Sequence, residues 1–195
     1  MTDVSLHSRP FSIPNMLTIG RVFAVPLLVS SLYFIEGNTG RWIAFGIFFV
    51  AAASDFLDGY LARAWQQQSA FGKMLDPIAD KLLVGASLLM LVHDGTIAGT
   101  AIWAALIILC REILVSGLRE FLAELQVKLH VTWLSKWKTI LQLIALGLLI
   151  IRPAIEGSVP GIENIGLTLL WCAAVITLWT GYGYTVAAVS EAMRR

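Results

Sequence analysis

Charged residues are scarce in this chain. They make up 14% of its 195 residues, against about 25% in an ordinary soluble domain, while 57% of the residues are hydrophobic. A soluble domain of this length has too little interior to bury so much apolar surface. Disordered and collagen-like chains are excluded on the same grounds. The composition therefore predicts an all-α integral membrane protein, because helices hydrogen-bond their own backbone in lipid.

The sequence also lacks an excess of either charge and a cysteine framework. Its 14 basic and 13 acidic residues give a net charge of +1, which argues against the basic surface that nucleic-acid binding requires. The two cysteines, Cys110 and Cys172, lie in apolar runs without metal-ligand spacing, so we expect no disulfide scaffold. Residues 1–14 have no apolar stretch of a cleavable signal peptide, and we expect the first long apolar run to stay in the membrane.

Long apolar stretches predict a bundle of six membrane-spanning helices, each needing about 20 mostly apolar residues. The predicted spans are Leu17–Ile35, Trp42–Trp65, Phe71–Val92, Ala98–Leu122, Ser135–Ile151 and Ile162–Val189. Clusters of Gly, Pro and Asn predict breaks at Glu36–Gly40, at His93–Gly95 and from Arg152–Pro153 to Pro160–Gly161. We expect a single domain over residues 1–195. Its juxtamembrane residues 1–15 either form a short interfacial helix or are disordered.

The lysine and arginine residues indicate an orientation. Basic residues next to membrane spans concentrate on the cytoplasmic side, and a cytoplasmic N-terminus places nearly all of them there. These residues are Arg9, Arg21, Arg63, Lys73, Arg119, Lys128, Lys136, Lys138, Arg194 and Arg195. Arg41 and Arg152 would face the opposite side. An even number of spans then returns the C-terminus to the cytoplasm.

Several ionisable residues lie inside the apolar spans, where they are costly and usually functional. They are Asp55, Asp58, Asp76, Asp80, Lys81, Arg111 and Glu112. Asp55 and Asp58 are three residues apart, and Asp76 and Asp80 are four apart, so each pair lies on one face of a helix. The second and third spans run antiparallel, and both pairs lie near their cytoplasmic ends. All four carboxylates are therefore expected in one layer.

Carboxylates at this spacing repel one another unless cations lie between them. Hard divalent ions such as Mg²⁺, Mn²⁺ or Ca²⁺ prefer oxygen ligands, and two ions about 4 Å apart are common in phosphoryl chemistry. Two alternatives remain open. The aspartates form buried salt bridges with Lys81, Arg63 and Lys73, or they belong to a proton or ion pathway, which would need acidic groups spread through the membrane.

Residues 55–80 read Asp55-x2-Asp58-Gly59-x2-Ala62-Arg63-x8-Gly72-x3-Asp76-x3-Asp80. This pattern resembles the signature of the CDP-alcohol phosphatidyltransferase family at every signature position. The resemblance implies an enzyme that transfers a phosphatidyl group from CDP-diacylglycerol to an alcohol and releases CMP. It also implies two divalent cations, Mg²⁺ or Mn²⁺, held by the four aspartates, with Asp80 as the base that accepts the proton of the alcohol.

The same resemblance implies a binding site for CDP-diacylglycerol and a homodimer. The residues that would line the CDP pocket are Ile13, Pro14, Asn15, Met16, Gly59, Arg63, Ser69 and Gly72. An arginine suits phosphate recognition because its planar fork binds two oxygens. Small residues such as Gly72 also have a simpler explanation, since they allow close helix packing in membranes.

Basic residues in the fourth and fifth spans suggest which alcohol is used. Arg111, Arg119, Lys136 and Lys138 would form a positive lining for an acceptor that carries a phosphate. The stretches 111–120 and 136–139 are similar to those of bacterial phosphatidylglycerophosphate synthases. This implies glycerol 3-phosphate as acceptor, phosphatidylglycerophosphate as product, and a bacterial inner membrane with the active site facing the cytoplasm. Inositol phosphate or serine as acceptor remains an alternative, as does a plain lipid-contacting role for these basic residues.

Overall fold

The computed structural model describes residues 13–64, 70–127 and 133–193, and the regular structure in these ranges is entirely α-helical. The helices are α1 (Ile13–Phe34), α2 (Gly37–Ala64), α3 (Ala70–His93), α4 (Ala101–Glu124), α5 (Trp133–Ile155) and α6 (Ile162–Ala192). Each of the six predicted spans coincides with one of them, which confirms the all-α prediction. Residues 1–12, the site of the suggested interfacial helix, lie outside the described ranges.

Two predicted helix breaks are wrong in their details. Helix α2 already begins at Gly37. Its φ of 74° is a backbone conformation that glycine adopts easily because it has no Cβ atom. At Gly40 a Cβ atom would collide with the carbonyl oxygen of Ile35, so glycine allows a short turn from α1. Helix α5 continues through Pro153 to Ile155, although a proline inside a helix removes one backbone hydrogen bond and crowds the carbonyl of the preceding turn. The next turn closes through Glu156 N–H to Arg152 O at 2.9 Å.

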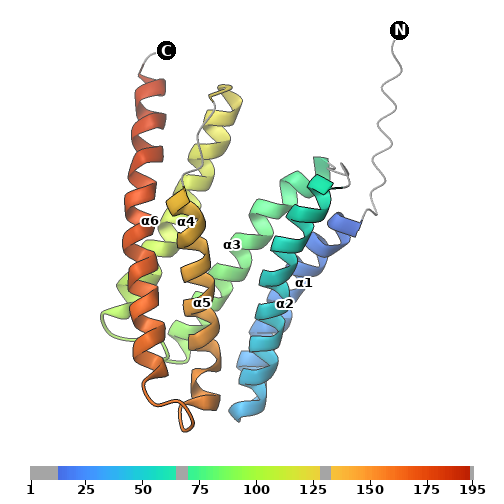
Figure 1. Cartoon of the computed structure of the whole chain (residues 1–195), viewed down its shortest axis with the longest axis vertical. Helices are drawn as coiled ribbons and strands as arrows, with labels where there is room; N and C mark the ends of the chain where they lie inside the picture. Colours follow the sequence, from blue (N-terminus) through green and yellow to red (C-terminus); the bar gives the residue numbers. More distant parts are fainter. Residues whose placement is uncertain (1–12, 65–69, 128–132, 194–195) are drawn as a thin grey trace.

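The six helices alternate in direction, and helix α1 packs closely against both α2 and α3, whereas α2 and α3 touch each other at few points. Helix α6 packs against α4 and α5, and α5 links the two groups by also packing against α2. In Figure 1, helices α1, α3 and α5 begin at the upper end of the bundle, and helices α2, α4 and α6 end there. The short turns α1–α2, α3–α4 and α5–α6 lie at the opposite end.

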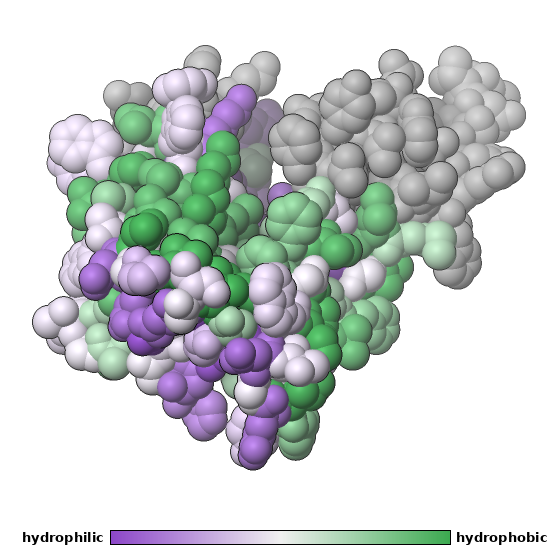
Figure 2. All heavy atoms as spheres, turned by 60° about the horizontal axis from the view of Figure 1, so that its bottom comes forward, coloured by the Kyte–Doolittle hydropathy of each residue, from purple (hydrophilic) through white to green (hydrophobic). Residues whose placement is uncertain are grey.

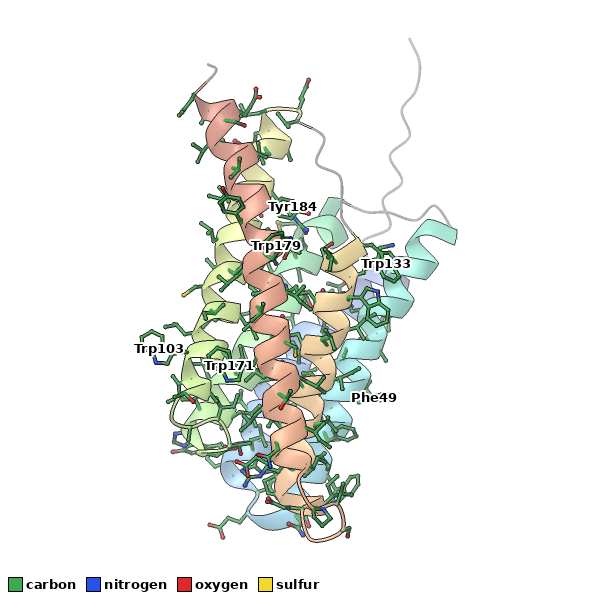
Figure 3. All side chains as sticks on the ribbon, turned by 60° about the vertical axis from the view of Figure 1, so that its left-hand side comes forward. Phe49, Trp103, Trp133, Trp171, Trp179 and Tyr184 are labelled. Carbon is green, nitrogen blue, oxygen red and sulfur yellow. The ribbon has the colours of Figure 1, made fainter. Side chains whose placement is uncertain are left out.

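The interior of the bundle is aliphatic, and its outer surface is also largely apolar. Leu28, Ile108 and Leu149 are fully buried in the core, while large side chains such as Trp103 and Trp179 are exposed and point away from it (Figure 3). An apolar exterior of this kind is expected where lipid replaces water. By length and composition, residues Met16–Phe34 of α1 and the helices α4, α5 and α6 qualify as membrane spans. The protein is therefore a multi-pass membrane protein.

The short-turn end of the bundle carries hydrophilic side chains, which Figure 2 shows gathered over one end of the surface. Arg41 of α2 binds Asp94 at 2.7 Å, and Arg152 of α5 binds Glu163 of α6 at 2.5 Å. These ion pairs join neighbouring helices at their ends. Arg41 and Arg152 thus lie at the end opposite to the signature aspartates, as their place in the sequence predicted.

Candidate active site

The aspartates of the signature lie at the end of the bundle where α2 ends and α3 begins. Asp55 of α2 and Asp76 and Asp80 of α3 are half-buried. The backbone of Asp58 belongs to α2, one turn beyond Asp55, but its side chain lies outside the described part of the structure. Asp80 is within electrostatic reach of Asp55 across the two helices. The structure therefore brings carboxylates of both helices into one region.

Helix α1 contacts the carboxylates of both helices, which the sequence did not lead us to expect. Nη1 of Arg21 donates to Oδ1 of Asp55 at 2.6 Å. One turn earlier, the hydroxyl of Thr18 donates to Oδ1 of Asp76, also at 2.6 Å. Thr18 and Arg21 are 2% and 1% exposed, so both are buried polar residues of an apolar helix. We had assigned Arg21 only to the positive charges flanking a span, although a charge inside an apolar run is the signal that reveals such a residue.

Among the side chains that the structure describes, Asp55 pairs with a cation that the sequence did not suggest for a salt bridge. Asp55 pairs with Arg21 of α1, whereas Lys81 donates its ammonium to the carbonyl oxygen of Pro77 at 2.8 Å in its own helix. The side chains of Arg63 and Lys73 lie outside the described part. The carboxylate of Asp55 is thus partly neutralised from α1.

The residues present fit a site for hard divalent cations. Carboxylate and hydroxyl oxygens from α1, α2 and α3 meet in one region, and these are the atoms that Mg²⁺ and Mn²⁺ prefer. Each bond from α1 uses Oδ1 of an aspartate, and a carboxylate has a second oxygen with which to bind an ion. Within the residues whose side chains are described, no three acidic, histidine or cysteine side chains enclose an ion position. The fourth signature carboxylate, Asp58, is not among those residues.

Two of the four predicted phosphate-binding residues are buried and engaged with neighbouring helices. Arg111 of α4 is 8% exposed and donates Nε to the carbonyl oxygen of Thr177 at 3.1 Å and Nη2 to the hydroxyl of Thr180 at 3.0 Å, both in α6. Lys138 of α5 is 4% exposed and forms an ion pair with Glu112 of α4. Glu112 also lies 3.6 Å from Nη1 of Arg111. These charges therefore tie α4, α5 and α6 together.

The other two, Arg119 and Lys136, are exposed. Nη2 of Arg119 donates to the hydroxyl of Tyr184 in α6 at 2.9 Å, and its guanidinium carbon lies 4.8 Å from the centre of that ring. Tyr184 is seen on α6 in Figure 3. No local pattern in the sequence singled out Tyr184, because 65 residues separate it from Arg119.

One of the four predicted phosphate-binding residues, Lys138, acts electrostatically on a signature aspartate. Asp80 is within electrostatic reach of Lys138, as well as of Arg21 and Lys81. Positive charge from α5 therefore adjoins the carboxylates of α2 and α3. This arrangement suits two negatively charged substrates that must approach each other, because each cation offsets part of their repulsion.

The predicted CDP-diacylglycerol-binding residues whose backbone the structure describes lie at the same end of the bundle. Ile13, Pro14, Asn15 and Met16 form the first turn of α1, Gly59 and Arg63 belong to the last turns of α2, and Gly72 is buried in the first turn of α3. Ser69 and the side chains of Ile13, Pro14, Asn15 and Arg63 lie outside the described part. Figure 1 places these three helix ends next to one another.

Comparisons with known proteins agree with the geometry. The sequence profile of the CDP-alcohol phosphatidyltransferase family matches residues 11–179. The chain belongs to the CDP-alcohol phosphatidyltransferase family. This confirms the resemblance found in the signature, and the matched region includes all four signature aspartates as well as the basic residues of α4 and α5.

Individual members of the CDP-alcohol phosphatidyltransferase family align over almost the whole chain. A protein of Rickettsia bellii is 43% identical over 174 residues, covering 89% of this chain and 93% of its own length. One of Haemophilus influenzae is 42% identical over 181 residues, covering 91% and 94%. One of Shigella flexneri is 38% identical over 183 residues, covering 93% and 97%. Each is named CDP-diacylglycerol–glycerol-3-phosphate 3-phosphatidyltransferase.

Proposed function

We propose that this protein transfers the phosphatidyl group of CDP-diacylglycerol to glycerol 3-phosphate, giving phosphatidylglycerophosphate and CMP. The observation that carries the proposal is the meeting of signature carboxylates of α2 and α3 against α1, where Arg21 binds Asp55 and Thr18 binds Asp76, each at 2.6 Å. Relatives that match about nine-tenths of the chain bear the name of this enzyme. An acceptor without a phosphate, such as serine, would have no use for the positive lining.

Asp55, Asp58, Asp76 and Asp80 would hold two divalent cations, Mg²⁺ or Mn²⁺. When bound, such ions supply positive charge to the pyrophosphate and stabilise the departing CMP. Four carboxylates suit two ions better than one, since each ion then receives enough negative charge. The bonds from Thr18 and Arg21 hold two of these side chains in place from α1.

The remaining chemistry is a displacement at phosphorus. The hydroxyl oxygen of glycerol 3-phosphate bonds to the phosphorus that carries the diacylglycerol, and the bond from that phosphorus to the bridging oxygen breaks, so that the electron pair leaves with CMP. The hydroxyl proton passes to the carboxylate of Asp80, which is needed because an alcohol is a weak nucleophile until its proton is removed. The position of Asp80, half-buried between acidic and basic groups, suits this role.

Arg119 and Lys136 are the basic residues that would contact the phosphate of the acceptor, because both are exposed. Arg111 and Lys138 would contribute positive charge from buried positions while they bind Thr177, Thr180 and Glu112. The guanidinium of Arg119 has donors besides the one it gives to Tyr184. It is therefore able to bind a phosphate oxygen and the tyrosine at the same time.

We place the active site at the cytoplasmic side of a bacterial inner membrane, with both termini in the cytoplasm. The basic residues near the aspartates support this orientation, and the bacterial relatives support a bacterial membrane. The acyl chains of the donor would stay in lipid while its head group reaches the carboxylates. The whole chain would act as one domain, and the protein would form a homodimer, as the family resemblance implies.

The acceptor is tested by supplying the purified protein in detergent with CDP-diacylglycerol, Mg²⁺ and one alcohol at a time. We expect glycerol 3-phosphate to support CMP release, and inositol phosphate and serine to support little. Asp80→Asn should remain folded and release almost no CMP. Release with serine or inositol phosphate alone would assign a different acceptor. Ion flux across sealed vesicles without nucleotide turnover would favour the transporter alternative.

A further inference from the structure

Two residues of α1 bracket the carboxylates of the neighbouring helices. Thr18 and Arg21 are three residues apart, so they share one face of the helix. Thr18 reaches Asp76 of α3 and Arg21 reaches Asp55 of α2, each at 2.6 Å. Both side chains are almost completely buried. A threonine and an arginine in such positions are costly unless their polar groups are bound, and each of the two contacts binds one of these polar groups.

The packing of the helices makes these contacts important for the relative position of the carboxylates. Helix α1 packs along both α2 and α3, while α2 and α3 have little contact with each other. Helix α1 therefore helps to set the distance between the aspartates of α2 and those of α3. Thr18 and Arg21 are the points at which α1 binds the carboxylates directly.

The positive charge of Arg21 also reduces the repulsion between the carboxylates. Asp55 and Asp80 lie within electrostatic reach of each other, and Arg21 is within reach of both. A buried guanidinium offsets part of the repulsion between carboxylates before any ion arrives. The guanidinium of Arg21 and the hydroxyl of Thr18 each bind one oxygen of an aspartate. Because the guanidinium is planar and rigid, these bonds also fix the direction in which the second carboxylate oxygen points.

We propose that Thr18 and Arg21 are positioning residues of the divalent-cation site, which orient Asp76 and Asp55 so that both carboxylates converge on the ions. The inference rests on the ion chemistry of the proposed function. It adds that a third helix, α1, orients the ligands that α2 and α3 supply. Partners that orient metal ligands in this way typically change metal affinity by about 10- to 100-fold when removed. Residues that merely joined helices would change the melting temperature and not the affinity for the ion.

The test is a Mn²⁺ titration of the full chain in detergent, in which free Mn²⁺ is measured by electron paramagnetic resonance. Thr18→Val keeps the shape of the side chain and removes the donor, and we expect its dissociation constant for Mn²⁺ to rise about 10-fold or more. Thr18→Ser restores the hydroxyl and should return the constant to near the wild-type value. Arg21→Lys keeps the charge without the fork and should also bind Mn²⁺ more weakly.

Ser31→Ala is the matched control, because Ser31 is another buried hydroxyl of α1 that donates only within its own helix, to the carbonyl oxygen of Leu28 at 2.8 Å. Its Mn²⁺ affinity should equal that of the wild type. If Thr18→Val binds Mn²⁺ as tightly as Ser31→Ala, or more tightly, the positioning role is wrong while the proposed function stands. If the wild-type protein binds no Mn²⁺, the ion chemistry of the proposed function is overturned together with the inference.

Discussion

Replacing Tyr184 by phenylalanine should weaken the binding of glycerol 3-phosphate specifically. Tyr184 is buried at 7% exposure and receives a hydrogen bond from Arg119 at 2.9 Å, while its ring lies 4.8 Å from the guanidinium carbon. Phenylalanine keeps the ring and removes only the hydroxyl. Arg119 then loses one of the two contacts that orient it toward a phosphate.

The size of the effect follows from the contact that is lost. A hydrogen bond involving a charged group contributes about 1.5–3 kcal/mol, but Arg119 is exposed and water replaces part of this bond. The cation–π contact, worth about 0.5–1 kcal/mol at an exposed site, remains. We therefore expect a loss of about 1 kcal/mol, which corresponds to a roughly fivefold higher KM for glycerol 3-phosphate.

The assay is the initial rate of CMP release, measured first at varied glycerol 3-phosphate and saturating CDP-diacylglycerol. It is then repeated at varied CDP-diacylglycerol and saturating glycerol 3-phosphate. The KM for CDP-diacylglycerol should change little. Tyr182→Phe is the matched control, since Tyr182 lies on the same helix and is 74% exposed. If Tyr184→Phe and Tyr182→Phe have the same KM for glycerol 3-phosphate, Arg119 does not contact the acceptor in the way proposed.

Two further predictions concern the charges that join α4 to α5 and α6. Glu112→Gln leaves the buried Lys138 without its ion-pair partner, and the loss of about 3 kcal/mol should lower the melting temperature by roughly 6–12 °C, measured by thermal unfolding in detergent. Gly181→Val should lower both stability and CMP release, because a Cβ atom at Gly181 would lie 3.1 Å from Cγ of Arg111 and overpacking of this kind costs about 1–3 kcal/mol.

Each of these variants has a control at an equivalent position. Glu156→Gln removes a partially exposed partner of Arg152, which should change stability by less than about 1 kcal/mol. Gly183→Val lies on the same helix as Gly181, and a Cβ atom there meets no atom within 4 Å. Equal melting temperatures for Glu112→Gln and Glu156→Gln, or for the two glycine variants, would contradict the packing that we describe for α4.

The helices and the carboxylate layer were predictable because their signals are local. Runs of apolar residues mark a helix wherever lipid surrounds it, and aspartates three or four residues apart share a helix face whatever the helix packs against. The pairs Asp55 and Asp58, and Asp76 and Asp80, on two antiparallel spans therefore indicated that the four carboxylates lie at one level. In the structure, Asp55 of α2 and Asp76 of α3 bind two side chains that lie one turn apart on α1.

The contacts that were missed join residues far apart in the chain. Thr18 and Asp76 are separated by 58 residues, and Arg21 and Asp55 by 34, so no periodic pattern connects them. Spacing alone does not reveal that α1 lies against both signature helices. Arg21 carried the one available signal, a charge within an apolar stretch, but a position near the end of a span gave it a simpler explanation.

The most direct test of the account is the location of Mn²⁺ in crystals of the full-length protein, measured by anomalous diffraction. We predict two peaks per chain between the carboxylates of α2 and α3, bounded by Asp55, Asp58, Asp76 and Asp80. Asp80→Asn should lose at least one of the two. The absence of peaks at saturating Mn²⁺, or peaks away from these side chains in crystals that retain activity, would contradict the claim that this carboxylate layer carries the reaction.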